Sequence, residues 1–303
     1  MRLALLSDIH FDLAPANRQA PLAAAIAAEL SEAGTDVVLV AGDVANRQDK
    51  VGRHLARIAV GRLANLYVPG NHDIWRSEAE RRAGHESFAA LTLLRGQCAQ
   101  AGFHYLPGAP QRLGQGENAW GFVGSLGWYD YSFAAEWLHL SDADIARKEI
   151  KGIIWQDREA AHFNDRTGRR LSDREVLAVF LGQLETDLRA LGLDERGAGP
   201  PTVALTHTLP YRSLVEYRQA IDWDYFSSYL GSARLGQLYD RYPQVRAAFA
   251  GHTHIPHQER LADGRIRATA PIGYYGTREF PYDLGTRIAF FDTVGRNLVP
   301  VGR

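Results

Sequence analysis

The sequence predicts an α/β protein in which two β-sheets pack as a sandwich between flanking helices. The N-terminal part alternates strand-like and helix-like runs, which is typical of parallel strands joined by helices. The C-terminal part has strand-like runs separated by tight turns, which indicates antiparallel hairpins. A two-sheet sandwich covered by helices accommodates both patterns.

Six short apolar runs are predicted as strands buried in the middle of a layered protein, because each is apolar on both faces and ends at a polar residue or glycine. They are Arg2–Leu6, Val37–Ala41, Leu66–Val68, Phe122–Gly124, Thr202–Leu205 and Val245–Ala250. Apolar residues three and four apart predict helices over Pro21–Ala33, which stops at Gly34, and over Val51–Leu63.

Two hairpins are predicted near the C-terminus. Asp263-Gly264 is a strong turn signal between Gln258–Leu261 and Arg265–Thr269. A second pair of strand-like runs lies around Gly295, and its members are Arg287–Asp292 and Asn297–Val301.

Residues 128–193 differ from the rest and are predicted to be mainly helical. Ser172 and Glu175 form a capping-box pattern at the start of the clearest helix, Ser172–Leu191. The run Ala198–Pro201 then breaks the chain before the next strand. We expect one domain over residues 1–303, with residues 128–193 as an insertion that could cap the core.

Composition excludes several classes of protein. Of 303 residues 46% are apolar, and 34 Lys and Arg nearly balance 35 Asp and Glu, so no protein-wide basic surface for nucleic acid is expected. A local basic groove stays possible. Cys98 is the only cysteine, which excludes an intrachain disulfide and a thiolate metal cluster. No apolar run approaches the roughly 18 residues of a membrane span, and the predicted location is cytoplasmic.

Metal-ligand side chains follow five of the predicted strands. In open α/β sheets such carboxyl ends form the binding crevice, so these side chains are expected to converge. Each motif alone has an ordinary explanation, such as a capped turn or a surface histidine pair. Five at equivalent positions together predict a metal centre. The candidate ligands are Asp8, His10, Asp43, Asn71, His207, His252 and His254.

The ordered motifs resemble the calcineurin-like metallophosphoesterase superfamily, whose fold is a four-layer α/β/β/α sandwich. They are Asp8-x-His10, Gly42-Asp43, Gly70-Asn71-His72-Asp73, His207 and Gly251-His252-x-His254. The resemblance implies two metal ions. It implies that Asp8, His10, Asp43 and His254 bind one ion. It implies that Asp43, Asn71, His207 and His252 bind the other, so that the Asp43 carboxylate bridges the pair.

This ligand set suits phosphoester hydrolysis. A shared carboxylate offsets the repulsion between two cations, and hydroxide held between them is a nucleophile at neutral pH. Nitrogen and oxygen ligands suit Mn, Fe, Zn, Co or Ni, in divalent or mixed-valence pairs. His72 follows a ligand directly and is predicted to protonate the leaving oxygen, with Asp73 orienting its ring.

The substrate is less clearly indicated. Most aromatic residues of the chain are expected in the core, but Trp75, Trp128 and Tyr129 are candidates for contact with a small nucleotide-like phosphoester. A phosphatase or phosphodiesterase is the first hypothesis. A nuclease of the same superfamily is the second and would need a basic groove. A non-catalytic interaction module is the third. The sequence does not indicate the oligomeric state.

Overall fold

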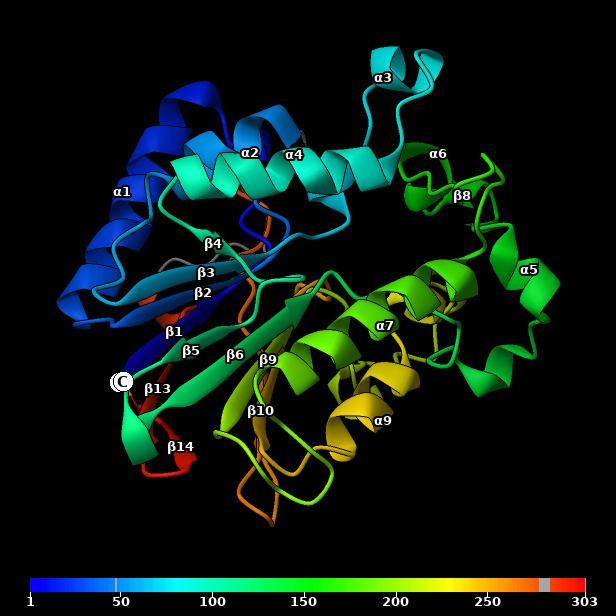
Figure 1. Ribbon diagram of the computed structural model, residues 1–303. Coiled ribbons are helices and arrows are strands. Elements are labelled where there is room, and N and C mark those ends of the chain that lie inside the picture. The colour runs from blue at the N-terminus through cyan, green and yellow to red at the C-terminus, as the bar shows by residue number, and fades with distance from the viewer. Residues whose placement is uncertain (47, 278–283, 303) are drawn as a thin grey trace.

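Two six-stranded sheets pack face to face, and helices cover the outer face of each (Figure 1). The computed structural model describes residues 1–46, 48–277 and 284–302. This architecture confirms the predicted sandwich flanked by helices. Within the described residues, no helix has the length and apolar composition needed to cross a membrane.

The first sheet has the strand order β14-β13-β1-β2-β3-β4. Its four parallel strands are β1 (Arg2–Leu6), β2 (Val37–Ala41), β3 (Ala64–Val68) and β4 (His104–Tyr105). The antiparallel strands β13 (Ala289–Val294) and β14 (Asn297–Pro300) extend the other edge.

The second sheet has the order β11-β12-β10-β9-β6-β5. Its parallel strands are β6 (Trp120–Ser125), β9 (Thr202–Thr206), β10 (Val245–Ala250) and β12 (Ile266–Thr269). The edges are the antiparallel strands β5 (Gln111–Leu113) and β11 (His257–Arg260).

Alternating side chains build two layers of core around each sheet. In β1, Leu3 and Leu5 belong to the core between the sheets, together with Phe122 and Phe249 of the second sheet. Ala4 and Leu6 face the other way and pack with residues of the flanking helices. Because neighbouring strand residues point to opposite faces, a strand buried on both faces needs apolar residues throughout, as these strands have.

Helices α1 (Ala16–Glu32), α2 (Gln48–Leu55) and α4 (Ser87–Gln100) cover the first sheet (Figure 1). Helices α7 (Asp173–Ala190) and α9 (Ala233–Asp240) cover the second. The short helices are α3 (Glu78–Arg82), α5 (Asp142–Ala146), α6 (Asp157–Ala160) and α8 (Ile221–Asp224). A separate hairpin pairs β7 (Glu149–Ile150) with β8 (Ile153–Ile154).

The structure corrects two predictions about helices. The helix expected over Val51–Leu63 ends at Leu55, because the chain must turn to enter β3, and Leu63 is 58% exposed instead of lying on the buried stripe. In residues 128–193, the capping box of Ser172 and Glu175 starts α7 as predicted. Residues 128–171 are mainly loops with short elements, so the prediction of a mainly helical stretch is wrong there.

Candidate functional site

All seven predicted metal ligands meet at one edge of the sandwich. They follow the carboxyl ends of β1, β2, β3, β9 and β10, which are central strands of the two sheets. Three groups of His and Asp side chains there have ligand atoms within 4.8 Å of one another, and each could hold a metal ion. The groups are Asp8, His10 and His254; His10, Asp43 and His72; and Asp43, His207 and His252.

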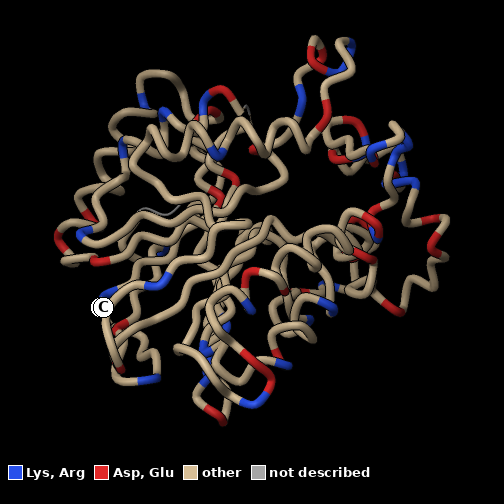
Figure 2. Tube along the Cα trace, in the orientation of Figure 1, with Lys and Arg blue, Asp and Glu red and all other residues tan. Residues whose placement is uncertain are grey.

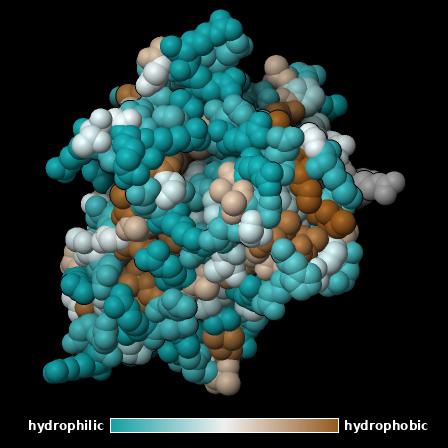
Figure 3. Space-filling view, turned by 90° about the vertical axis from the view of Figure 1, so that its right-hand side faces the viewer, coloured by the Kyte–Doolittle hydropathy of each residue, from teal (hydrophilic) through white to brown (hydrophobic). Residues whose placement is uncertain are grey.

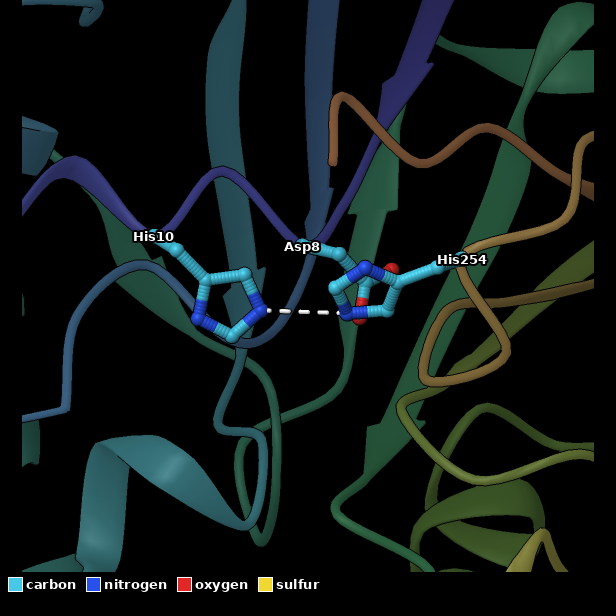
Figure 4. A group of neighbouring side chains, drawn as sticks. All are labelled: Asp8, His10 and His254. Atoms are coloured by element: carbon cyan, nitrogen blue, oxygen red, sulfur yellow. Dashed lines mark hydrogen bonds and ion pairs between the residues drawn. The ribbon is translucent and has the colours of Figure 1, made fainter. Parts of the chain in front are cut away.

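Asp8, His10 and His254 form one side of the site (Figure 4). The Nε2 atoms of His10 and His254 are 3.2 Å apart, and His254 Nε2 is 3.6 Å from Asp8 Oδ1. The backbone N–H of His252 donates to both oxygens of Asp8 and so fixes the orientation of that carboxylate.

Asp43 lies between the two sides of the site. Its Oδ2 is 3.7 Å from His10 Nε2, and its Oδ1 is 3.4 Å from His207 Nε2. One carboxylate therefore presents an oxygen to each side, which is the geometry that a bridging ligand needs.

His207, His252 and Asn71 form the other side. His207 Nε2 is 3.0 Å from both Asn71 Oδ1 and His252 Nδ1. The outer nitrogens of the two rings face carbonyl oxygens, with His207 Nδ1 2.8 Å from that of Ala41 and His252 Nε2 3.2 Å from that of Tyr229. A carbonyl accepts only from N–H, so in the neutral rings the two inner nitrogens carry lone pairs. These lone pairs repel unless a cation lies between them, which fits a metal ion.

The electrostatics agree with a site that binds cations. Burial lowers the pKa of His207, but the Asp43 carboxylate outweighs burial and raises it to about 9. Burial raises the pKa of Asp43, but His207 and the nearby imidazoles hold it well below its usual value. Burial lowers the pKa of His10, and burial with the His207 cation lowers that of His252 to about 4. Without metal, one proton on His207 thus occupies the place of the cation.

Five of the seven candidate ligands adopt left-handed backbone conformations, with φ between 45° and 74°. They are Asp8, His10, Asp43, His252 and His254. This conformation is uncommon for residues other than glycine, and such strained residues cluster at functional sites. The turns that end the strands are therefore shaped to aim ligands, at a cost in backbone energy.

Two glycines allow β2 and β3 to approach each other at the site. A Cβ atom on Gly42 would lie 2.6 Å from Gly70 N and 2.6 Å from His207 Nδ1. A Cβ atom on Gly70 would lie 2.5 Å from Asp43 N. Both positions require glycine, because any side chain would displace Asp43 or His207.

Asp73 does not orient His72, contrary to the sequence prediction. Its carboxylate accepts hydrogen bonds from the backbone N–H groups of Asp43, Val44, Ala45 and Gly70, and from the hydroxyl of Tyr67. These bonds fix the loop that carries Asp43. Asp73 is thus a residue that positions the candidate bridging ligand.

Asn46 takes the role that was predicted for Asp73. Asn46 Oδ1 lies 2.6 Å from His72 Nδ1. The other ring nitrogen of His72, Nε2, faces the site and is 3.8 Å from Asp43 Oδ2. Trp75 stacks on the ring of His72, with ring centroids 3.5 Å apart. Burial lowers the pKa of His72 well below its usual value, so the ring is neutral before an anion binds.

A pocket of about 400 Å³ opens beside these ligands. Its walls are mainly apolar, and no Lys or Arg lines it within the described residues. On the face that carries residues 128–171, hydrophobic patches interrupt a mostly hydrophilic surface (Figure 3). The apolar and aromatic lining residues are Trp75, Ile153, Ile154, Trp155, Trp223, Phe226, Leu230, Ile255 and Tyr274.

The structure supports one of the three aromatic residues predicted to contact substrate. Trp75 lines the pocket. Trp128 and Tyr129 are 1% and 0% exposed and do not line it, so their predicted role needs correction. Trp128 donates to Asp173 and Tyr129 to Asp157, as is usual for buried aromatic residues with a polar atom.

A family model for calcineurin-like phosphoesterases matches residues 1–256. The chain belongs to this family. It is 26% identical over 245 residues to an acyl-carrier-protein phosphodiesterase, PptH, of Mycobacterium tuberculosis, a match that covers 79% of this chain and 69% of that protein. The family prediction is therefore confirmed, and the chain is a metal-dependent phosphoric ester hydrolase.

Two solved structures share the calcineurin-like phosphoesterase fold. The phosphopantetheinyl hydrolase PptH of M. tuberculosis aligns with a TM-score of 0.68 at 22% identity, covering 99% of this chain and 95% of its own. A dimetal phosphatase of Danio rerio aligns with a TM-score of 0.52 at 12% identity, covering 99% and 98%.

Sequence reasoning missed several residues of this calcineurin-like site. Asn46, in a loop, contacts His72, and Asp157, the first residue of α6, contacts Asn71. Neither belongs to a recognisable sequence motif. Tyr274 packs its ring 4.4 Å from that of His254. Trp155 was expected in the core but lines the pocket. The cluster of aromatic residues was a signal, although it did not separate pocket residues from core residues.

In the part of the chain that the structure describes, no Lys or Arg lines the pocket of this phosphoesterase. Lys and Arg alternate with Asp and Glu along the trace (Figure 2). Arg82 pairs with Glu78, and Arg169 pairs with Asp165 and Glu175, so the charges of these exposed arginines are balanced by neighbouring carboxylates.

Proposed function

We propose that this phosphoesterase binds two divalent transition-metal ions and hydrolyses a phosphodiester that links phosphopantetheine to a carrier protein. The apolar pocket directly beside the candidate ligands is the observation that carries the choice of substrate. The similarity to a phosphodiesterase that is named for acyl-carrier protein supports it.

One ion is held by Asp8, His10, Asp43 and His254, and the other by Asp43, Asn71, His207 and His252. The two-sided arrangement of Asp43 and the facing lone pairs of His207 and His252 support this assignment. Neutral imidazoles with carboxylate and amide oxygens suit Mn, Fe, Co, Ni or Zn. Bound ions of this kind supply a water-derived nucleophile at neutral pH and neutralise the phosphoryl oxygens.

His72 is the group that protonates the leaving oxygen. Its Nδ1–H donates to Asn46 Oδ1, which stabilises the imidazolium form, so that Nε2 can carry the second proton. An anionic phosphoester next to the buried imidazole raises the pKa of His72, because the negative charge stabilises the imidazolium form. His72 is therefore protonated when the substrate is bound. Water loses one proton to solvent, and the resulting hydroxide adds to phosphorus. The bond from phosphorus to the carrier-protein oxygen breaks, that oxygen leaves with the proton of His72, and solvent returns a proton to the ring.

The pocket suits a long, uncharged arm. Trp75, Trp155 and Phe226 provide apolar contact for the aliphatic parts of pantetheine. A nucleotide with further phosphates would need cationic partners, and no described lining residue is Lys or Arg. We therefore narrow the nucleotide-like substrate that was expected from the sequence to a phosphopantetheine-like one.

Within the insertion expected over residues 128–193, residues 128–171 act as a cap. Ile153, Ile154 and Trp155 of this stretch line the pocket together with Trp75 and Tyr274. The cap gives the substrate arm an apolar environment and limits the access of bulk water.

The test uses the Mn²⁺-loaded protein and a carrier protein that bears phosphopantetheine. We expect intact mass spectrometry to show conversion to the bare carrier protein, with release of phosphopantetheine. Asp43→Asn is the inactive control. Parallel assays use a bis-aryl phosphodiester, an aryl phosphomonoester, a dinucleotide and duplex DNA.

The outcomes separate the alternatives. A carrier protein that stays intact while the bis-aryl diester is hydrolysed would refute the proposed substrate. Faster cleavage of the dinucleotide would restore the nucleotide hypothesis, and cleavage of DNA would favour the nuclease. No hydrolysis of any ester with Mn, Fe, Co, Ni or Zn would favour an interaction module.

A further inference from the structure

Asp157 is a buried carboxylate that belongs to the cap but contacts the metal centre. It is the first residue of α6 and is 1% exposed. Its Oδ1 accepts from Asn71 Nδ2 at 2.9 Å and from Trp75 Nε1 at 2.7 Å. Its Oδ2 accepts from Trp155 Nε1 at 2.8 Å and from Tyr129 Oη at 3.2 Å. Four donors thus converge on its two oxygens.

The chemistry of these partners requires a carboxylate. Three of the four donors are N–H groups that cannot accept, so every oxygen position must be an acceptor. In Asp157→Asn, an NH2 group would face an N–H group of Asn71, of a tryptophan, or of both. No ion pair joins Asp157 to Lys or Arg within the described residues, so these four hydrogen bonds are its compensation for burial.

Asp157 determines which way the side chain of Asn71 faces. Because Asn71 Nδ2 donates to Asp157, its Oδ1 is directed into the site, 3.0 Å from His207 Nε2. An amide without this partner can turn over and present NH2, which binds no cation. The negative charge also polarises the amide and makes Oδ1 a better donor of electrons to a metal ion.

The same carboxylate also fixes the positions of two tryptophans that line the pocket. Trp75 stacks on His72 and lines the pocket, and Trp155 lines it from the cap. Both indole N–H groups end on Asp157. Asp157 therefore contacts the candidate ligand Asn71 and two tryptophans of the pocket, one of which stacks on the ring of the candidate acid.

We propose that Asp157 is a positioning residue through which the cap sets the metal affinity at Asn71 and the shape of the pocket. This inference rests on the proposed metal site. It predicts that the cap and the metal centre are not independent, since a change in the cap reaches the ligand Asn71 by one hydrogen bond.

The experiment compares wild type with Asp157→Asn and with the matched control Asp173→Asn. Asp173 is a carboxylate of residues 128–193 whose side chain is 12% exposed, and it accepts from Trp128, Tyr131 and Lys148 without contact to any candidate ligand. Metal-free proteins are titrated with Mn²⁺ by calorimetry, and bound metal is counted by elemental analysis. The thermal midpoint of each metal-free protein is measured beside it.

For Asp157→Asn we expect one of two Mn²⁺ ions to bind roughly 10- to 100-fold more weakly, as for other residues that orient metal ligands. Excess Mn²⁺ should restore kcat on a bis-aryl phosphodiester, while KM stays raised because Trp75 and Trp155 are displaced. Asp173→Asn should lower the thermal midpoint and leave both Mn²⁺ affinities unchanged.

The inference would be overturned if Asp157→Asn bound both Mn²⁺ ions with wild-type affinity, or if Asp173→Asn lost as much Mn²⁺ affinity as Asp157→Asn. Either result would leave the proposed function intact. A wild-type protein that binds no metal would overturn both. If Asp157→Asn does not fold, Asp157→Ser leaves room for water to accept from the four donors. The same weakening of one ion is expected there, and its absence would refute the role.

Discussion

At the scale of single residues, the candidate ligands combine strain with repulsion between like groups. Five of them have left-handed backbones, and two pairs of imidazole nitrogens face each other at 3.0 and 3.2 Å. Strained conformations of this kind cost of order 1–3 kcal/mol each. Without metal ions the backbone strain is not offset, and the proton on His207 relieves the repulsion only between His207 and His252. The metal-free protein should therefore be less stable.

Chelation of the metal ions should therefore lower the thermal midpoint by several degrees. An ion at roughly 100 times its Kd stabilises the folded state by about 2.7 kcal/mol. Scanning calorimetry with EDTA and with Mn²⁺ measures the difference. The midpoint of Asp43→Asn should respond much less to Mn²⁺, and equal midpoints for the wild type with and without Mn²⁺ would contradict the prediction.

Replacement of His72 should affect chemistry without affecting metal content. For His72→Asn we expect kcat to fall roughly 10²- to 10⁴-fold on a diester with an alkyl leaving group, because its oxygen needs a proton. The loss should be much smaller with a nitrophenyl leaving group. Steady-state kinetics on both substrates, with elemental analysis, test this.

Asn46→Leu is the companion to His72→Asn, because it removes only the partner of His72 Nδ1. It should show a smaller loss with the same dependence on the leaving group. Equal losses on both substrates would indicate that His72 shapes the site and does not donate a proton.

At the scale of elements, the packing of α2 buries an unusual group. His54 is 0% exposed, and its ring stacks on Phe11 with centroids 4.8 Å apart. Neither of its nitrogens has a hydrogen-bond partner in the described part of the chain. Burial, with Arg53 and Arg57 nearby, lowers its pKa to about 4.

The free energy of unfolding should decrease as the pH falls, because His54 is buried in its neutral form. Its folded pKa lies below its unfolded value, so the unfolded chain binds the proton more readily below pH 6.5. This loss of unfolding free energy is absent above pH 6.5 and grows toward pH 4, by up to about 1.4 kcal/mol per pH unit. Urea unfolding of metal-free His54→Leu should show a smaller loss between pH 7 and 5 than wild type. His85→Gln, at an exposed position, should match wild type.

The main elements could be predicted because their patterns are local. The bounds of β1, β2 and β10 agree with the predicted strands residue by residue. Each ends in four or five consecutive apolar residues, and one Ser or Gly then separates the strand from a candidate ligand. The two-residue strand β7 and the five-residue helix α5, which has little more than one turn, are too short to show a period. Most of residues 128–171 was therefore unpredictable in detail.

The candidate ligands were predictable for a similar reason, because all seven follow the ends of five buried strands. Their supporting residues were not. Asp157 reaches Asn71 across 86 positions, and Asn46 reaches His72 across 26. No local pattern carries a contact of that separation. For Asp73 the prediction failed in the opposite way. Asp73 and His72 are neighbours in sequence, but Asp73 does not contact the ring of His72 in the structure.

At the scale of the whole molecule, charge is spread evenly and the formal net charge is −1. The site must therefore attract its substrate by contacts within the pocket, without help from a long-range basic field. A nuclease with a basic groove would lose about 10³- to 10⁵-fold in affinity between 50 and 200 mM salt.

We expect kcat/KM for a small diester to change less than about threefold over that range of salt, because screening acts mainly on long-range charge interactions. Binding of labelled duplex DNA should be undetectable at either concentration. Stopped-flow or steady-state rates and fluorescence anisotropy measure the two quantities. Steep salt dependence of both would point to a nucleic-acid substrate.

The close approach of Gly42 and Gly70 has a consequence for how this protein can vary. Asp43 and His207 are held by the absence of a side chain at two neighbouring positions, where even a methyl group collides. In a library that randomises the edge of the sandwich, active clones should keep glycine at both positions. The walls of the pocket should accept many exchanges. The positions least tolerant of substitution would then include two residues that offer the substrate no side chain at all.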